Sequence, residues 1–199
     1  IVNTCAFVHD AKTESIDAIL DLIQLKKEGR IRKVVVCGCL AQRYGDTLRR
    51  EMPEVDAFIG SGALEEGARR FALTPRHYAY LKISEGCLSE CSFCVIPSIK
   101  GRYRSMPVED LMRQARELDR LKVRELNIIG QDSTAYGVDL PGQPSLAQLL
   151  ERLLREAAHI PWFRLLYLHP SRITPHLLAV IRSDTRVCRY IDVPIQHCN

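Results

Sequence analysis

Three cysteines lie within one short segment, GCLSECSFCVIP, residues 86–97. Cys87, Cys91 and Cys94 are spaced C-x3-C-x2-C, so a single loop can bring three sulfurs to one centre. Thiolates in such patterns bind zinc or iron–sulfur clusters. No fourth ligand is adjacent in the sequence. The spacing therefore predicts either a distant fourth ligand or a coordination position left open for another molecule.

The residues alone leave three interpretations of this loop. Buried core cysteines are expected on a periodic apolar face, whereas this segment contains Ser, Glu and Gly. Structural zinc normally takes four protein ligands and would here need a residue such as His169 to complete a non-catalytic site. An iron–sulfur cluster held by only three thiolates leaves one iron open. This last interpretation is favoured because it explains the missing ligand.

Composition sets broad limits on the protein. The chain has 199 residues, of which 46% are hydrophobic, which is enough for one large or two small cores. A net charge of +4 is too small to indicate nucleic-acid binding. Eight cysteines without a signal peptide or an apolar run long enough for a bilayer predict reduced thiols in the cytoplasm and no membrane partner.

The elements that must position these cysteines follow a β-helix-β pattern. Strands are expected at residues 1–5, 33–38 and 55–60, with helices over 10–29, 46–50 and 65–71. The first unit then ends near the Thr74-Pro75 break.

A second series of strands and helices begins at Tyr78. Its expected strands are 78–84, 125–130, 162–168 and 190–195. Helices are expected after Pro107, after an N-cap at Ser145, and after an N-cap at Thr174 followed by Pro175. Repeated β-helix-β units require parallel strands, which predicts a doubly wound sheet or an incomplete barrel.

Polar residues follow each strand of this second unit. The cysteine loop follows the first strand, Gln131 and Asp132 the second, His169 the third, and Gln196 the fourth. Because the carboxyl ends of parallel strands meet at one edge, these residues are expected to form one site.

With Phe93 before its last cysteine, the motif resembles that of the radical S-adenosylmethionine (radical SAM) enzymes. The resemblance implies a partial (β/α) barrel and a 4Fe–4S cluster on Cys87, Cys91 and Cys94. The open iron would bind S-adenosylmethionine, whose reductive cleavage gives a 5′-deoxyadenosyl radical. The resemblance also suggests Phe93, Gln131 and Gln196 as cofactor contacts.

The segments IVNTCAFVHDAKTESID and VVVCGCLAQRYGD resemble the amino-terminal domain of methylthiotransferases. That domain supplies three cysteines to a second 4Fe–4S cluster, and Cys5 and Cys39 match two of them. The third is expected upstream of Ile1. The implied α/β organisation is a small parallel-sheet methylthiotransferase domain at residues 1–74 and a radical SAM partial barrel at 75–199, in a fragment that lacks both ends and is inactive alone.

The segments AKTESID and IIGQDSTAYGVDL favour the RimO branch, which modifies an aspartate of the twelfth small-subunit ribosomal protein. The alternative is the MiaB branch, which acts on an adenosine of transfer RNA and tends to carry Gln-Asn where this chain has Gln131-Asp132. The resemblance implies two 4Fe–4S clusters, S-adenosylmethionine, the ribosomal protein, and an electron donor such as flavodoxin or ferredoxin. Nucleic acid could be contacted through the ribosome or a further domain.

Overall fold

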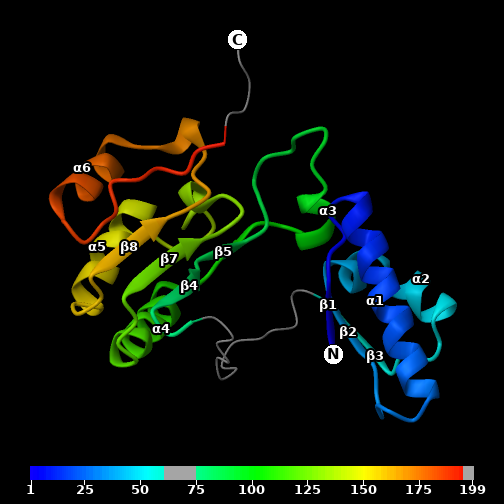
Figure 1. Cartoon of the computed structure of the whole chain (residues 1–199). Helices are drawn as coiled ribbons and strands as arrows, with labels where there is room; N and C mark the ends of the chain where they lie inside the picture. The colour runs from blue at the N-terminus through cyan, green and yellow to red at the C-terminus, as the bar shows by residue number, and fades with distance from the viewer. Residues whose placement is uncertain (61–74, 195–199) are drawn as a thin grey trace. The chain divides into compact units, whose positions relative to one another are not determined.

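The computed structural model describes residues 1–60 and 75–194, which form two units (Figure 1). Unit 1 comprises Ile1–Arg69 with Glu90–Gly101, and unit 2 comprises Arg70–Ser89 with Arg102–Asn199. Each unit contains its own parallel sheet and its own hydrophobic core. The predicted α/β class is confirmed, whereas the domain boundary at 74/75 stays a prediction because residues 61–74 lie outside the described residues.

Unit 1 contains a three-stranded parallel sheet in the order β1-β2-β3. Its strands are β1 (Val2–Thr4), β2 (Val35–Gly38) and β3 (Ala57–Gly60), joined by α1 (His9–Lys27) and α2 (Cys39–Glu51). The short helix α3 (Ile96–Lys100) also packs against α2. Apolar residues of all three helices fill the core with the central strand: Ile19, Ile23, Val36, Leu40, Leu48 and Ile99. Residues that follow the cysteine loop thus belong to the core of unit 1.

The helix α2 is longer than predicted. It begins at Cys39, directly after the strand, whereas the sequence indicated only residues 46–50. Gly38, with φ of 98°, turns the chain between strand and helix, and Tyr44 has non-helical angles inside the helix (φ −126°, ψ 15°). Because the kink interrupts the helix, the apolar residues before and after Tyr44 do not follow one helical period. The sequence pattern therefore does not indicate a single helix here. The helix predicted at 65–71 lies outside the described residues.

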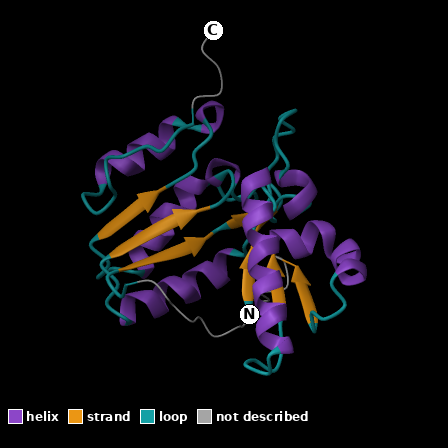
Figure 2. Ribbon diagram, turned by 45° about the vertical axis from the view of Figure 1, so that its right-hand side comes forward, coloured by secondary structure: helices purple, strands orange, loops and turns teal. Residues whose placement is uncertain are grey.

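Unit 2 contains a second parallel sheet, in the order β4-β7-β8. The strands are β4 (Tyr78–Lys82), β7 (Glu125–Ile129) and β8 (Trp162–Leu165), and the helices are α4 (Val108–Arg120), α5 (Leu146–Glu156) and α6 (Pro175–Ser183). Alternate strand residues are buried in one core with these helices: Ala79, Leu81, Leu126, Ile128, Phe163 and Leu165. Figure 2 shows the strands of each sheet running in the same direction, with helices beside them. Their carboxyl ends therefore lie along one edge.

Two of the predicted helix starts are confirmed by their caps. Ser145 Oγ accepts a hydrogen bond from Gln148 N at 3.3 Å, while Gln148 Oε1 accepts one from Ser145 N at 2.8 Å. Thr174 Oγ1 accepts from Leu177 N at 3.2 Å, immediately before Pro175. These bonds satisfy N–H groups that have no partner within the helix.

A small antiparallel pair that the sequence did not predict closes the base of the cysteine loop. Strand β5 (Ser84–Glu85) pairs with β6 (Arg104–Ser105), so that Ser84 is opposite Ser105 and Glu85 is opposite Arg104. After the cysteine loop the chain therefore returns to the side of β5. Two short 3₁₀ helices, η1 (Ser133–Ala135) and η2 (Pro170–Arg172), follow the ends of β7 and β8.

The strand predicted at 190–195 is wrong over the part that the structure describes. Residues 190–194 form no strand, and Asp192 bonds to the segment that follows β8. The carboxylate of Asp192 accepts from Tyr167 N at 2.9 Å, and its carbonyl accepts from Leu168 N at 3.0 Å. The Asp192 side chain thus accepts a hydrogen bond that a backbone carbonyl would accept in a strand ladder. In addition, Pro194 has no N–H to donate to a ladder. None of the described helices combines the length and apolar character needed to span a bilayer.

Candidate functional site

Cys5 and Cys39 lie at the carboxyl ends of two neighbouring strands of unit 1. In the parallel register Asn3 is paired with Cys37 and Thr4 with Gly38, so Cys5 and Cys39 each directly follow the last paired residue of their strand. Adjacent strands are about 4.8 Å apart. Both thiols are free and half-exposed. The structure therefore places the two cysteines predicted to share a cluster directly after neighbouring strands of one sheet.

The backbone around Cys5 is held by residues that the sequence analysis missed. Ser15 of α1 is 8% exposed, and its Oγ accepts from Cys5 N at 3.0 Å. Arg43 of α2 donates from Nη1 to Ala6 O at 3.2 Å. One signal was available, because Ser15 begins the stripe that continues with the buried Ile19 and Ile23 at intervals of four residues. A polar residue in a buried stripe indicates a hydrogen-bonding role.

The N-terminus of α2 lies at the same edge of unit 1. Because the helix begins at Cys39, the unpaired N–H groups of its first turn point towards this end of the sheet. Such a terminus favours negative charge, which suits a thiolate or a cluster held by thiolates.

The three cysteines of the C-x3-C-x2-C loop are divided between the two units. Cys87 belongs to unit 2, whereas Cys91 and Cys94 belong to unit 1. All three are free and half-exposed. Ser89 N donates to Cys87 Sγ at 3.4 Å, and Cys94 N donates to Cys91 O at 2.9 Å, which forms a turn between the second and third cysteines.

The described side chains form no group of three or more His, Cys, Asp or Glu arranged to hold a metal ion. The donor set nevertheless fits an iron–sulfur cluster in its chemistry, because each thiol is free, accessible and carried by a loop. His169, the residue considered for a zinc site, has Nδ1 2.8 Å from Ser171 Oγ.

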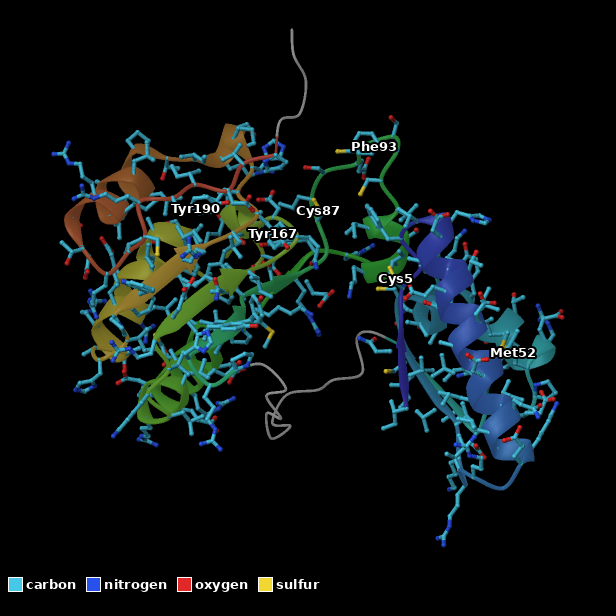
Figure 3. The ribbon with its side chains drawn as sticks, viewed as in Figure 1. Cys5, Met52, Cys87, Phe93, Tyr167 and Tyr190 are labelled. Carbon is cyan, nitrogen blue, oxygen red and sulfur yellow. The ribbon has the colours of Figure 1, made fainter. Side chains whose placement is uncertain are left out.

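The predicted cofactor contacts have different surroundings. Gln131, two residues beyond β7, accepts a hydrogen bond at Oε1 from Gly86 N at 2.7 Å. Phe93 is 86% exposed at the outer part of its loop, and Cys87 lies where the loop leaves the sheet (Figure 3). Gln196 lies outside the described residues. Of the two that the structure describes, Gln131 is held to the start of the cysteine loop by a side-chain hydrogen bond.

Buried polar groups support the segment that follows Gln131. Tyr136 is 2% exposed and donates from its hydroxyl to Met106 O at 2.9 Å, and burial raises the pKa of this phenol. Burial also raises the pKa of Asp139, but hydrogen bonds from Ser105 outweigh it and leave that pKa below its ordinary value. Gly137 N donates to Ser105 Oγ at 2.9 Å. The neutral phenol and the charged carboxylate thus fix this segment to β6.

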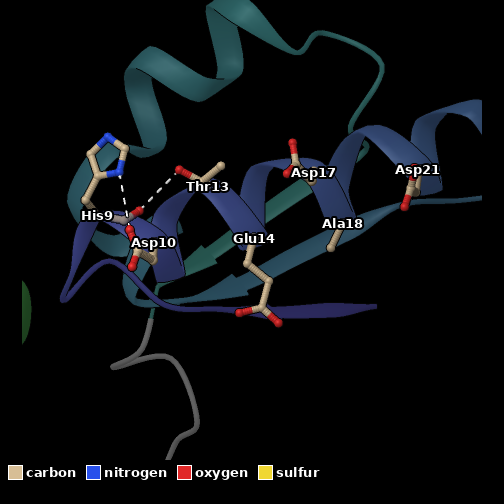
Figure 4. Close-up of a pocket in the computed structure, with 7 residues that line it drawn as sticks. All are labelled: His9, Asp10, Thr13, Glu14, Asp17, Ala18 and Asp21. Carbon is tan, nitrogen blue, oxygen red and sulfur yellow. Dashed lines mark hydrogen bonds and ion pairs between the residues drawn. The ribbon is translucent and has the colours of Figure 1, made fainter.

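A shallow hollow runs along one face of α1, apart from the cysteines (Figure 4). Most of its lining is polar or acidic: His9, Asp10, Thr13, Glu14, Asp17, Ala18 and Asp21. His9 Nδ1 lies 3.8 Å from Asp10 Oδ1, and both side chains are almost fully exposed. This is the solvated face of an amphipathic helix.

Comparison with known families divides the chain as the two sheets do. Residues 81–199 match the radical SAM superfamily, and residues 1–60 match the uncharacterized protein family UPF0004. A solved structure of the radical S-adenosylmethionine methyltransferase TsrM from Kitasatospora setae, with cobalamin and a [4Fe-4S] cluster bound, is similar with a TM-score of 0.50. It is 19% identical and covers 66% of this chain and 27% of its own, so it supports the fold alone.

Closer relatives match over nearly the whole chain. The ribosomal protein uS12 methylthiotransferase RimO of Geobacter sulfurreducens is 45% identical over 227 residues, covering 99% of this chain and 50% of the relative. The RimO protein of Chlorobium chlorochromatii is also 45% identical, over 212 residues, with 100% and 48% coverage. The chain spans about half the length of the curated relatives it matches.

Proposed function

The chain belongs to the radical SAM superfamily, and on this basis we propose that the protein is a methylthiotransferase of the RimO type. The reaction would add a methylthio group to the β-carbon of an aspartate in ribosomal protein uS12. The observation that carries the proposal is the 45% identity to RimO proteins across both units, with both predicted cysteine sets present as free thiols. The same similarity favours the ribosomal protein over transfer RNA as the substrate.

The chemistry explains why two cofactor sites are needed. The β-hydrogen of an aspartate is too weakly acidic for a carboxylate or imidazole base to remove at neutral pH. When bound, the clusters would supply a 5′-deoxyadenosyl radical from S-adenosylmethionine and a sulfur for transfer. The protein must therefore hold the substrate carbon near both sites and exclude water from them.

Specific residues of this chain would hold the two groups. Cys87, Cys91 and Cys94 would ligate the cluster that binds S-adenosylmethionine, leaving one iron for the amino and carboxylate groups of that cofactor. Cys5 and Cys39 would ligate the second cluster with a third thiolate from outside the 199 residues. Phe93 and Gln196 would contact the cofactor.

The proposed activity also implies a location and partners. A substrate that is a ribosomal protein requires a cytoplasmic enzyme. Reduction of the first cluster requires a low-potential electron donor such as a flavodoxin or a ferredoxin. Nucleic acid would be contacted through the ribosome or through a further domain.

The decisive experiment is product analysis with the complete protein. After anaerobic reconstitution with iron and sulfide, we expect S-adenosylmethionine cleavage and a methylthio group on the aspartate of uS12, detected by peptide mass spectrometry. Transfer RNA incubated in parallel should stay unmodified. Modification of transfer RNA instead of uS12 would favour the MiaB type, and a protein that takes up zinc but no iron or sulfide would contradict both enzyme assignments.

A further inference from the structure

Gln131 forms a long-range hydrogen bond with the residue that precedes the first cysteine of the loop. Its Oε1 lies 2.7 Å from Gly86 N, although the two residues are 45 positions apart. Both belong to unit 2. Gln131 follows the carboxyl end of β7, the central strand of the sheet, so this bond ties the start of the cysteine loop to the most supported strand.

The hydrogen bond to Gln131 lies directly before Cys87, where Gly86 turns the chain out of β5. Gly86 has φ of 81°, a left-handed conformation that favours glycine, and it follows directly after Glu85 at the end of β5. Antiparallel pairing with β6 therefore ends one residue before Gly86. Beyond the paired strands, the acceptor that the structure gives to Gly86 N is the side chain of Gln131. The bond thereby fixes the direction of the Glu85–Gly86 peptide, one residue before Cys87.

Asp132, the residue after Gln131, is also held in place by side-chain hydrogen bonds. Asp132 is 3% exposed, and its Oδ2 accepts from Arg172 Nη1 at 2.6 Å. Its Oδ1 accepts from Thr134 Oγ1 at 2.5 Å, and Thr134 Oγ1 in turn accepts from His169 N at 3.1 Å. A buried carboxylate thus joins the end of β7 to the segment after β8, which limits movement of the backbone that carries Gln131.

We infer that Gln131 is a positioning residue for Cys87: its side-chain carbonyl holds Gly86 N and so sets where the first thiolate of the loop is presented. This inference rests on the proposed function, because it assumes that the loop binds a cluster. This positioning role differs from a direct cofactor contact, because it requires only that Oε1 accepts a hydrogen bond from Gly86 N. Glutamate at this position keeps such an acceptor at the same distance from the backbone, and leucine removes it with little change in size.

The test compares Gln131→Leu and Gln131→Glu in the complete protein, with Gln148→Leu as a matched control. Gln148 Oε1 also accepts from a backbone N–H, that of Ser145 at 2.8 Å, but at the start of α5. Without cofactors, exchange of the Gly86 amide hydrogen should be at least about fivefold faster in Gln131→Leu, as expected for loss of one hydrogen bond. Protection at Gly86 should be kept in Gln131→Glu and in Gln148→Leu.

A second measurement follows the reconstituted cluster while the second site is disabled by Cys5→Ala and Cys39→Ala. Iron should be lost to a chelator about tenfold faster from Gln131→Leu, by analogy with residues that orient metal ligands. Gln131→Glu should restore retention. If Gly86 exchange and iron retention are unchanged in Gln131→Leu while S-adenosylmethionine binding weakens, Gln131 is a direct cofactor contact and the inference is wrong. If the parent protein itself takes up no cluster, the proposed function fails instead.

Discussion

Replacement of Gly137 by alanine should destabilise unit 2 more than any ordinary substitution in a loop. Gly137 is buried with φ of +86°, and a Cβ built there falls on the carbonyl oxygen of Pro144, with the Pro144 nitrogen also within 3.2 Å. Both are backbone atoms, so no side chain can rotate away. Hydrogen bonds to Ser105 Oγ and from Leu140 N hold Gly137 in place from both sides.

The size of the effect has two parts. A left-handed conformation costs a residue with a Cβ about 1–2 kcal/mol, and forcing an extra carbon into a packed site costs about 1–3 kcal/mol. Together they predict a loss of about 2–5 kcal/mol, a large share of the stability of a typical domain of about 5–15 kcal/mol. Gly142 separates the two parts, because its φ is +75° but nothing lies within 4 Å of its Cβ position. Gly142→Ala should therefore lose only the conformational part.

The measurement is urea unfolding of the 199-residue chain, followed by the fluorescence of Trp162. Because Trp162 is the only tryptophan of the 199 residues and lies in β8, its signal reports on unit 2. We expect the free energy of unfolding to fall further for Gly137→Ala than for Gly142→Ala, by about 1–3 kcal/mol. Equal losses for the two variants would show that the contact with Pro144 does not restrict the site, and would refute the reasoning.

Three other predictions test the caps, the ion pairs and the second cysteine site. Ser145→Ala removes an N-cap hydrogen bond of α5 and should lower the free energy of unfolding by about 1 kcal/mol, measured by the same urea titration. Hydrogen bonds from Arg186 lower the pKa of Asp184 from its ordinary value of 3.8. The pair therefore stabilises the fold fully above pH 3.8 and progressively less below it. The difference in the free energy of unfolding between the parent and Asp184→Asn should shrink as the pH falls below 3.8. Ser15→Ala removes the hydroxyl that holds Cys5 N and should weaken iron retention at the second cluster about 10–100-fold, measured with a chelator after the first cluster has been removed by mutation.

The prediction for Ser15 has two controls on the same helix, α1. Ser15→Thr keeps the hydroxyl and should retain iron, and Thr13→Ala removes an exposed hydroxyl of α1 that donates to His9 O. Unchanged retention in Ser15→Ala would assign Ser15 to packing alone. A pH-independent difference for Asp184→Asn would mean that the carboxylate keeps its ordinary pKa, and full stability of Ser145→Ala would mean that solvent replaces the cap.

Parts of the fold that follow from local chemistry could be predicted from the sequence. Ser145 and Thr174 mark helix starts through hydrogen bonds within three residues, and the alternation of apolar strands and helices predicts both parallel sheets. Elements that depend on few residues were missed. The β5-β6 pair has two residues on each side, and the kink at Tyr44 concealed the first half of α2.

The sequence predicts candidate ligands for the site but not the residues that hold them in place. Spacing identifies Cys87, Cys91 and Cys94, because the ligands of one loop are neighbours in sequence. The hydrogen bond from Gly86 to Gln131 joins residues 45 positions apart, and no repeating pattern in the sequence indicates it. Residues that hold ligands in place depend on the tertiary structure, which explains why Ser15 was found only there.

The antiparallel pair β5-β6 has a consequence for how this part of the chain can change during evolution. Ser84 and Ser105 are paired whatever lies between them, so residues added or removed in the intervening segment leave the register of β4-β7-β8 untouched. Lengthening a closed loop is inexpensive, at about 0.6 kcal/mol for each doubling. The length of this loop can thus change while the three strands of the sheet in unit 2 keep their pairing.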